Sequence, residues 1–139
     1  MARKIVLISC VSKKLSHRAK TKEIYISTLF KLNLNYAQSL HPDKIYVLSA
    51  KHGLLDLDTE IDPYNQTLNS MSENENKAWA ESVLKQLGEQ VDLKNDHFVF
   101  LAGQKYRKNL VPVIKSYEIP LEGLTIGRQL QFLKRANTL

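Results

Sequence analysis

Short runs of aliphatic and aromatic residues constrain the fold of this chain more than any other feature. Three of them occupy residues 5–8, 44–48 and 98–101, and a weaker fourth covers 116–119 and ends at Pro120. Continuous apolar runs of this length are typical of strands that are covered on both faces. The sequence therefore predicts a central sheet of about four strands inside the molecule.

Helical patterns lie between these runs. Ser72 followed three residues later by Glu75 predicts a capping box at the start of one helix. Strands that alternate with helices indicate a single three-layer α/β domain over residues 1–139, with a mainly parallel central sheet and helices on both faces. Apolar residues at helical spacing place the helices at 23–40, 73–87, 106–114 and 126–135.

Composition limits the class of protein further. Hydrophobic residues make up 43% and charged residues 24% of the 139 residues, which is typical of a globular domain. No apolar run approaches the roughly 20 residues that span a bilayer, and the N-terminus has no secretory pattern. Cys10 is the single cysteine, and the four histidines lack metal-ligand spacing. We therefore expect a cytoplasmic protein without a membrane segment, a disulfide, a metal or a cofactor.

Charge is unevenly distributed along the chain. Residues 1–51 carry a net charge of +8, residues 52–100 carry −7 and residues 101–139 carry +5. If the two basic parts pack together, they form a positive face that suits a polyanion such as a nucleic acid. The alternative is a solvated surface with lysine-rich helix ends.

The segments that follow the predicted strands are the first places to look for a ligand. In open parallel sheets, ligands bind beyond the carboxyl ends of the strands. Each of these segments contains a cation and three contain glycine, a combination that suits a phosphorylated ligand. The Walker and G-x-G-x-x-G patterns are absent, which argues against a nucleoside-triphosphate enzyme. The four segments are 9–14, 49–55, 102–106 and 120–129.

The segment 49–55 contains the sharpest pair of candidate catalytic residues, Lys51 and His52. A histidine here could act as a general acid, or could polarise a carbonyl oxygen of a base, and its alternative role is that of an ordinary loop residue. Asp56 and Asp62 follow closely and could stabilise a cationic transition state. The alternative for these carboxylates is a solvated loop.

Tyrosine and lysine side chains complete the candidate site. Tyr25, Tyr64 and Tyr106 offer flat faces on which a base could stack, although such residues are often half-buried packing residues. Lys13 and Lys14 would join Lys51 in holding phosphate.

A set of sequence strings resembles an uncharacterised family of bacterial and phage proteins known only as a domain of unknown function. The strings are SC-SKK, IYIS-LF, YVLSAKHGLL, PYNQTL, LAGQKY and IPLEGLTIGRQLQFL, and they cover almost the whole chain. The resemblance places a signature on Cys10, Ser12, Lys13, Tyr25, Ser27, Ser49, Lys51, His52, Gly53, Tyr64, Gly103, Tyr106, Gly123, Gly127 and Gln129.

More distantly, the order of motifs is similar to the YaaA peroxide-stress proteins, which bind DNA, and to the uracil-DNA glycosylase type of α/β fold. This resemblance implies the handling of a base or a nucleotide. The chain departs from the glycosylases after its first strand, where SCVSKK replaces the segment with their water-activating aspartate. Glycosylase chemistry would need another carboxylate.

Two functions follow from this evidence. The first is an enzyme that cleaves the N-glycosidic bond of a modified base, with His52, Lys51, Asp62 and Asp56 as its catalytic residues. The second is a non-catalytic module that binds DNA, RNA or a nucleotide through the same residues. In both, the ligand-binding residues would be Cys10, Ser12, Lys13, Lys14, Ser49, Gly53, Tyr64, Gly103, Tyr106, Gly127 and Gln129. A third possibility is an intracellular protein-interaction module.

Overall fold

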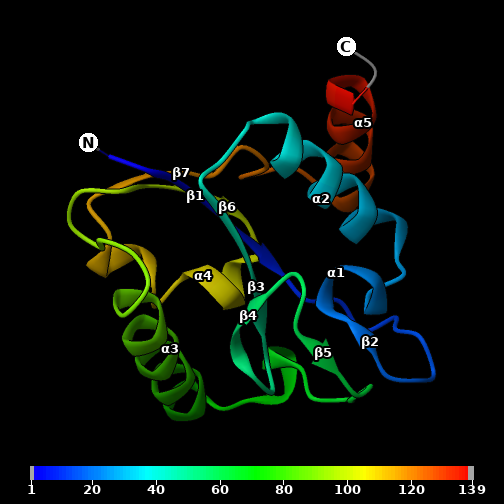
Figure 1. Ribbon diagram of the computed structural model, residues 1–139, viewed down its shortest axis with the longest axis horizontal. Coiled ribbons are helices and arrows are strands. Elements are labelled where there is room, and N and C mark those ends of the chain that lie inside the picture. Colours follow the sequence, from blue (N-terminus) through cyan, green and yellow to red (C-terminus); the bar gives the residue numbers. More distant parts are fainter. Residues whose placement is uncertain (1, 138–139) are drawn as a thin grey trace.

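A computed structural model describes residues 2–137 of the chain as a sheet between two layers of helices (Figure 1). The central sheet has five strands in the order β4-β3-β1-β6-β7. Their bounds are β1 Lys4–Ser9, β3 Lys44–Ser49, β4 Gly53–Asp56, β6 His97–Leu101 and β7 Ser116–Glu118. A separate antiparallel pair is formed by β2 Ala19–Lys20 and β5 Glu60–Ile61.

Four of the five strands are parallel, and β4 alone in this sheet is antiparallel to its neighbour, β3. The helix α2 Thr28–Ser39 packs against α5 Ile126–Asn137 on one face, while α3 Glu73–Gly88 contacts β4 from the other (Figure 1). The predicted α/β class, with helices on both faces of a mainly parallel sheet, is confirmed. No helix in residues 2–137 is long and apolar enough to cross a membrane.

The three strong apolar runs contribute to the core as predicted, whereas the weaker fourth run forms β7, an edge strand whose three residues are exposed. Ile5–Ile8 of β1 and Phe98–Leu101 of β6 are at most 1% exposed, because β1 is the middle strand and β6 adjoins it. Strands covered on both faces need apolar side chains in both directions, which explains the absence of alternation. The capping box of α3 is also confirmed, with the Ser72 and Glu75 side chains accepting from each other's backbone N–H.

The helix predicted over 23–40 is two helices. The short α1 Thr21–Ile24 ends at Tyr25, which is extended, and Ser27 then caps α2 by accepting a hydrogen bond from the Phe30 amide. The backbone between the helices bonds to the loop after β1, because the Ile26 amide donates to the Lys13 carbonyl. A tertiary contact therefore overrides the helical periodicity at this point.

The helix predicted over 106–114 was also wrong in extent. The chain instead forms the short α4 Gln104–Arg107 and the 3₁₀ turn η2 Val111–Val113. Pro112 lies inside η2 and has no amide hydrogen for a continuous helix. A further 3₁₀ turn, η1 Leu68–Ser70, precedes α3. β2, β4 and β5 are short strands without a long apolar run, and no pattern in the sequence predicted them.

Candidate functional site

A pocket opens at the carboxyl edge of the sheet, between the ends of β1 and β6. The chain leaves β1 toward α2 and β3 on one side, and leaves β6 toward α4 and β7 on the other. Neighbouring strands with diverging connections define the crevice in which open α/β sheets bind ligands. The cavity volume is about 340 Å³, at the lower end of the range for small-molecule sites.

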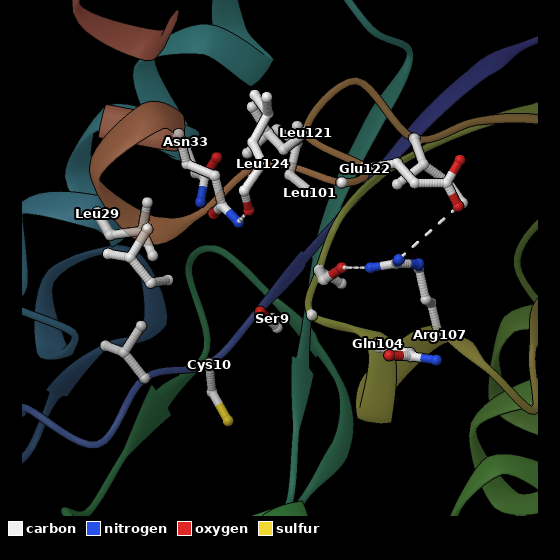
Figure 2. Close-up of a pocket in the computed structure, with 17 residues that line it drawn as sticks. Ser9, Cys10, Leu29, Asn33, Leu101, Gln104, Arg107, Leu121, Glu122 and Leu124 are labelled. Carbon is white, nitrogen blue, oxygen red and sulfur yellow. Dashed lines mark hydrogen bonds and ion pairs between the residues drawn. The ribbon is translucent and has the colours of Figure 1, made fainter. Parts of the chain in front are cut away.

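The walls of this switch-point pocket are mixed in character (Figure 2). Leucine side chains from α2, β6 and the loop after β7 form its apolar part, while side-chain amides, one guanidinium and one carboxylate form its polar part. A few directional polar groups in an apolar setting are typical of a specific ligand site. The lining residues are Ser9, Cys10, Val11, Leu29, Asn33, Leu101, Ala102, Gly103, Gln104, Arg107, Ile119, Leu121, Glu122, Gly123, Leu124, Ile126 and Gln129.

Asn33 is the most informative polar residue of the pocket. It lies on the buried face of α2 and is 6% exposed, and its Oδ1 atom has no hydrogen-bond partner within residues 2–137. A buried acceptor without a partner costs free energy, so it is normally satisfied by protein, water or ligand. The Oδ1 atom is itself enclosed, so a bound molecule would reach this acceptor only after a small shift of the side chains around it.

Other polar groups lie around the pocket. Gln129 donates from Nε2 to the Leu124 carbonyl at 3.0 Å, which fixes its amide against the loop after β7. On the side opposite Asn33, Arg107 donates from Nη1 to the Ala102 carbonyl at 2.8 Å and faces Glu122 (Figure 2). The pocket thus has an amide side and a guanidinium side.

A second hollow of about 300 Å³ adjoins the first, and Cys10 and Val11 line both. The Cys10 Sγ and Tyr106 hydroxyl are 3.2 Å apart, and burial together with the neighbouring thiol raises the pKa of Tyr106. The second hollow combines amide, hydroxyl and ammonium groups with the apolar surface of Val11 and the Tyr106 ring. Its lining residues are Cys10, Val11, Ser12, Lys14, Asn65, Gln66, Thr67, Asn69 and Tyr106.

Lys14 lies at this second hollow above two aromatic rings. Its Nζ is 4.3 Å from the centroid of Tyr64 and 5.7 Å from that of Tyr25, distances at which a cation is attracted to a ring face. Partial burial lowers the pKa of Lys14. Neither Tyr25 nor Tyr64 lines either hollow. The ring faces that were predicted to stack a base instead contact the Lys14 ammonium.

Ser49 and two tyrosines form a buried hydroxyl cluster beneath this edge. The Tyr64 hydroxyl is 2.6 Å from that of Tyr25 and 2.7 Å from the Ser49 Oγ. The Ser49 Oγ also accepts hydrogen bonds from the Lys51 and His52 amides, and the Ser49 carbonyl accepts one from the Trp79 indole N–H. These contacts hold the turn after β3 and give Ser49 and Tyr64 a positioning role.

The four predicted catalytic residues lie outside the lining of both hollows. Lys51 and Asp56 are exposed, and the Asp62 carboxylate, whose side chain is 70% exposed, pairs with Arg18. The His52 ring stands edge-on to Tyr64, and its buried Nε2 has no partner among the described residues. Burial and the nearby Lys51 charge lower the pKa of His52. Their catalytic roles stay predictions.

The predicted binding residues divide into four groups. Cys10, Gly103 and Gln129 line the switch-point pocket, and Ser12, Lys14 and Tyr106 line the adjoining hollow with Cys10. Ser49 and Tyr64 lie in the hydroxyl cluster. Outside both linings are Lys13 and Gly127, which are exposed, and Gly53, which is buried at the start of β4.

Sequence reasoning missed Asn33, Arg107 and Glu122. Asn33 had a readable signal, because it interrupts the apolar stripe of α2 that Leu29 and Ala37 continue at helical spacing. A polar residue at such a position needs a partner. Arg107 and Glu122 had no local signal, since 15 residues separate them and only the packing of the loop after β7 brings them together.

No group of three or more His, Cys, Asp and Glu side chains within residues 2–137 has an arrangement suited to a metal ion. The polar side chains at the switch-point pocket are instead three amides, a hydroxyl, a thiol, one guanidinium and one carboxylate. Fold and pocket together define an α/β domain with a small pocket of mixed polar and apolar lining at its topological switch point.

The chain matches one protein family over most of its length. The family described as a family of unknown function (DUF6884) matches residues 5–135, and the chain belongs to it. Comparisons with curated proteins and with solved structures found no match.

Proposed function

We propose that this protein binds one nucleotide unit, either free or within a nucleic-acid strand, in the switch-point pocket. The unpaired Asn33 Oδ1 is the observation that carries the proposal. A nucleobase edge presents N–H donors and ring acceptors in one plane, and an asparagine amide is a common partner for such an edge. The leucine side chains around Asn33 supply apolar surface for the faces of a base.

The charge around the pocket supports the same ligand class. α2 and α5, which both contribute lining residues, contain no Asp or Glu. None of the cations of these helices lines the pocket, but they give the surface beside it a positive charge that no carboxylate on the same helix offsets. Their cationic residues are Lys31, Arg128, Lys134 and Arg135. Phosphate groups of a nucleotide or strand suit this setting.

Cleavage of an N-glycosidic bond is the second candidate, and one observation favours it. Glu122 is a carboxylate that lines the pocket, where the chemistry would need one to stabilise an oxocarbenium-like sugar. Incubation of the protein with plain and base-modified DNA, followed by detection of abasic sites, tests this candidate. Abasic sites formed by wild-type protein and lost in Glu122→Gln would support cleavage, and intact DNA throughout would leave binding alone.

Asn33→Leu tests the binding proposal. Leucine has the same branched shape and number of side-chain heavy atoms but removes both polar atoms, so the pocket loses its partner for the base while the helix keeps a buried side chain. We expect affinity for nucleosides and nucleotides, measured by calorimetry or NMR titration, to fall about tenfold or more. The free energy of unfolding should hold or rise, because an unpaired buried acceptor disappears.

Asn35→Leu is the matched control, since Asn35 is exposed two residues along the same helix. It should leave the affinity unchanged. Equal affinities in wild type and Asn33→Leu would contradict the proposal, as would a failure of every nucleoside and nucleotide to bind wild-type protein.

A further inference from the structure

Arg107 and Glu122 form a loose pair at the guanidinium side of the pocket. The Arg107 Nη2 and Glu122 Oε2 are 3.9 Å apart, which is too long for a hydrogen bond. Nη1 is in contrast tightly held by the Ala102 carbonyl. The guanidinium is therefore fixed in direction but still has donors to offer on the Glu122 side.

The two partners differ in their freedom to move. The Arg107 side chain is 16% exposed, whereas the Glu122 side chain is 67% exposed. Glu122 also precedes Gly123, whose φ of +80° marks a turn in the loop after β7. Ion pairs with an exposed member contribute little stability, so displacing this carboxylate from Arg107 costs little.

We propose that Arg107 binds a phosphate ester of the ligand and that Glu122 competes with this phosphate for the guanidinium. This inference rests on the function proposed above and names the ligand more closely as a nucleoside phosphate. A guanidinium matches phosphate geometry with two parallel N–H donors, and phosphate has more charge and more acceptor atoms than a carboxylate.

The arrangement of the pocket fits such a ligand. Asn33 lies on one side and Arg107 on the other, with the ends of β1 and β6 between them (Figure 2). A cavity of about 340 Å³ suits a single nucleotide, whose base would lie at Asn33 and whose phosphate at Arg107. Gly103 lies beside Arg107, and no atom lies within 4 Å of where its Cβ would be, which leaves room for the phosphate oxygens.

The test compares four nucleosides with their 5′-monophosphates and with a single-stranded DNA of about four nucleotides. Wild-type protein should bind at least one monophosphate about tenfold or more tightly than its nucleoside. In Arg107→Gln this preference should disappear while nucleoside affinity holds, and that retained affinity shows that the variant is folded. Tighter binding of the strand than of the monophosphate would identify nucleic acid as the source of the phosphate.

Glu122→Gln should change monophosphate affinity in the opposite direction from Arg107→Gln. Removal of the competing charge should raise monophosphate affinity several-fold and leave nucleoside affinity unchanged, a gain that misfolding cannot produce. Lys105→Gln is the matched control, because Lys105 is an exposed cation on α4 outside the pocket lining. It should behave as wild type.

The outcomes separate the two proposals. Nucleosides and monophosphates that bind equally, with binding still dependent on Asn33, would overturn the role of Arg107 and keep the proposed function. Monophosphate affinity that falls in Glu122→Gln would also overturn it, since the carboxylate would then help the ligand. No binding of any of these ligands would overturn both proposals.

Discussion

His52, the most prominent candidate residue in the sequence, lies against Tyr64 and outside the lining of both hollows. Its ring stands edge-on to Tyr64 at 5.5 Å, and its Nε2 is buried without a partner among residues 2–137. Protonation would place a charge and a second N–H in this buried position. Burial is the largest cause of the lowered pKa of His52, and the neighbouring Lys51 charge adds to it.

These conditions predict how stability depends on pH. Because the pKa of His52 is lower in the folded state, the unfolded chain binds the proton first as pH falls below about 6.5. The His52 contribution to the free energy of unfolding is therefore present above that pH and is lost as pH falls toward the folded-state pKa. NMR titration of the imidazole signals should find His52 below 6.5.

Lys51→Ala should move this titration upward, since it removes a nearby positive charge. Lys31→Ala removes a lysine from the distant helix α2 and should leave the His52 titration unchanged. An unshifted His52 in Lys51→Ala would mean that burial alone sets its pKa.

At the scale of elements, the turn from β3 into β4 decides the geometry of the sheet edge. Ser49 ends β3, and β4 begins at Gly53, whose φ of +75° lies in the region that favours glycine. Gln86 of α3 reaches across and accepts the Leu54 amide at 3.0 Å. Helix α3 is thereby joined to the edge strand at the position where the chain reverses.

Gly53→Ala should destabilise the protein by about 1–3 kcal/mol, as measured by urea unfolding. A Cβ at this position would adopt an unfavourable φ and would collide with the Gln86 amide. Gly127→Ala is the matched control, because no atom lies within 4 Å of a Cβ there and the residue is inside α5. Its stability should hold or rise by up to about 1 kcal/mol, and equal effects of the two substitutions would contradict this explanation.

At the scale of the whole molecule, the fold separates charge by face. α5, from the basic C-terminal part of the sequence, packs on α2 from the basic N-terminal part. Helix α3, from the acidic middle, lies on the other face and contains Glu73, Glu75 and Glu81 (Figure 1). The two basic segments thus meet on the face that carries the pocket, as a polyanion site would require.

This separation predicts a dependence of nucleic-acid binding on salt. Affinity for a single-stranded DNA of about 12 nucleotides should fall steeply with rising salt. The double variant Arg128→Ala/Lys134→Ala on α5 should weaken binding and reduce the slope of log affinity against log salt by about one to two. Lys77→Ala/Lys85→Ala on α3 removes the same charge from the other face and should change neither, and an equal loss in both variants would refute a role for the α5 face.

Part of the pocket was readable from the sequence. The segments after the strands were predicted to meet at one edge, and residues from three of them, including Cys10, Gly103 and Gln129, do line the pocket. The segment with Lys51 and His52 lies at the same edge, but it forms the chain reversal between β3 and β4, which the Ser49 hydrogen bonds stabilise. A short strand such as β4 is stabilised by its partner β3 rather than by its own pattern, so local sequence does not reveal it.

The amino-acid sequence by itself determined the α/β class, the buried strands and the capped helix α3, because hydrophobic periodicity and capping act within a few residues. Tertiary structure alone decided which side chains share the pocket. Asn33, Arg107 and Glu122 come from α2, from the short helix α4 and from the loop after β7, and they line one pocket because α2 packs against β1 while the connections of β1 and β6 diverge. Contacts of this kind depend on the packing of distant segments, which no local pattern encodes.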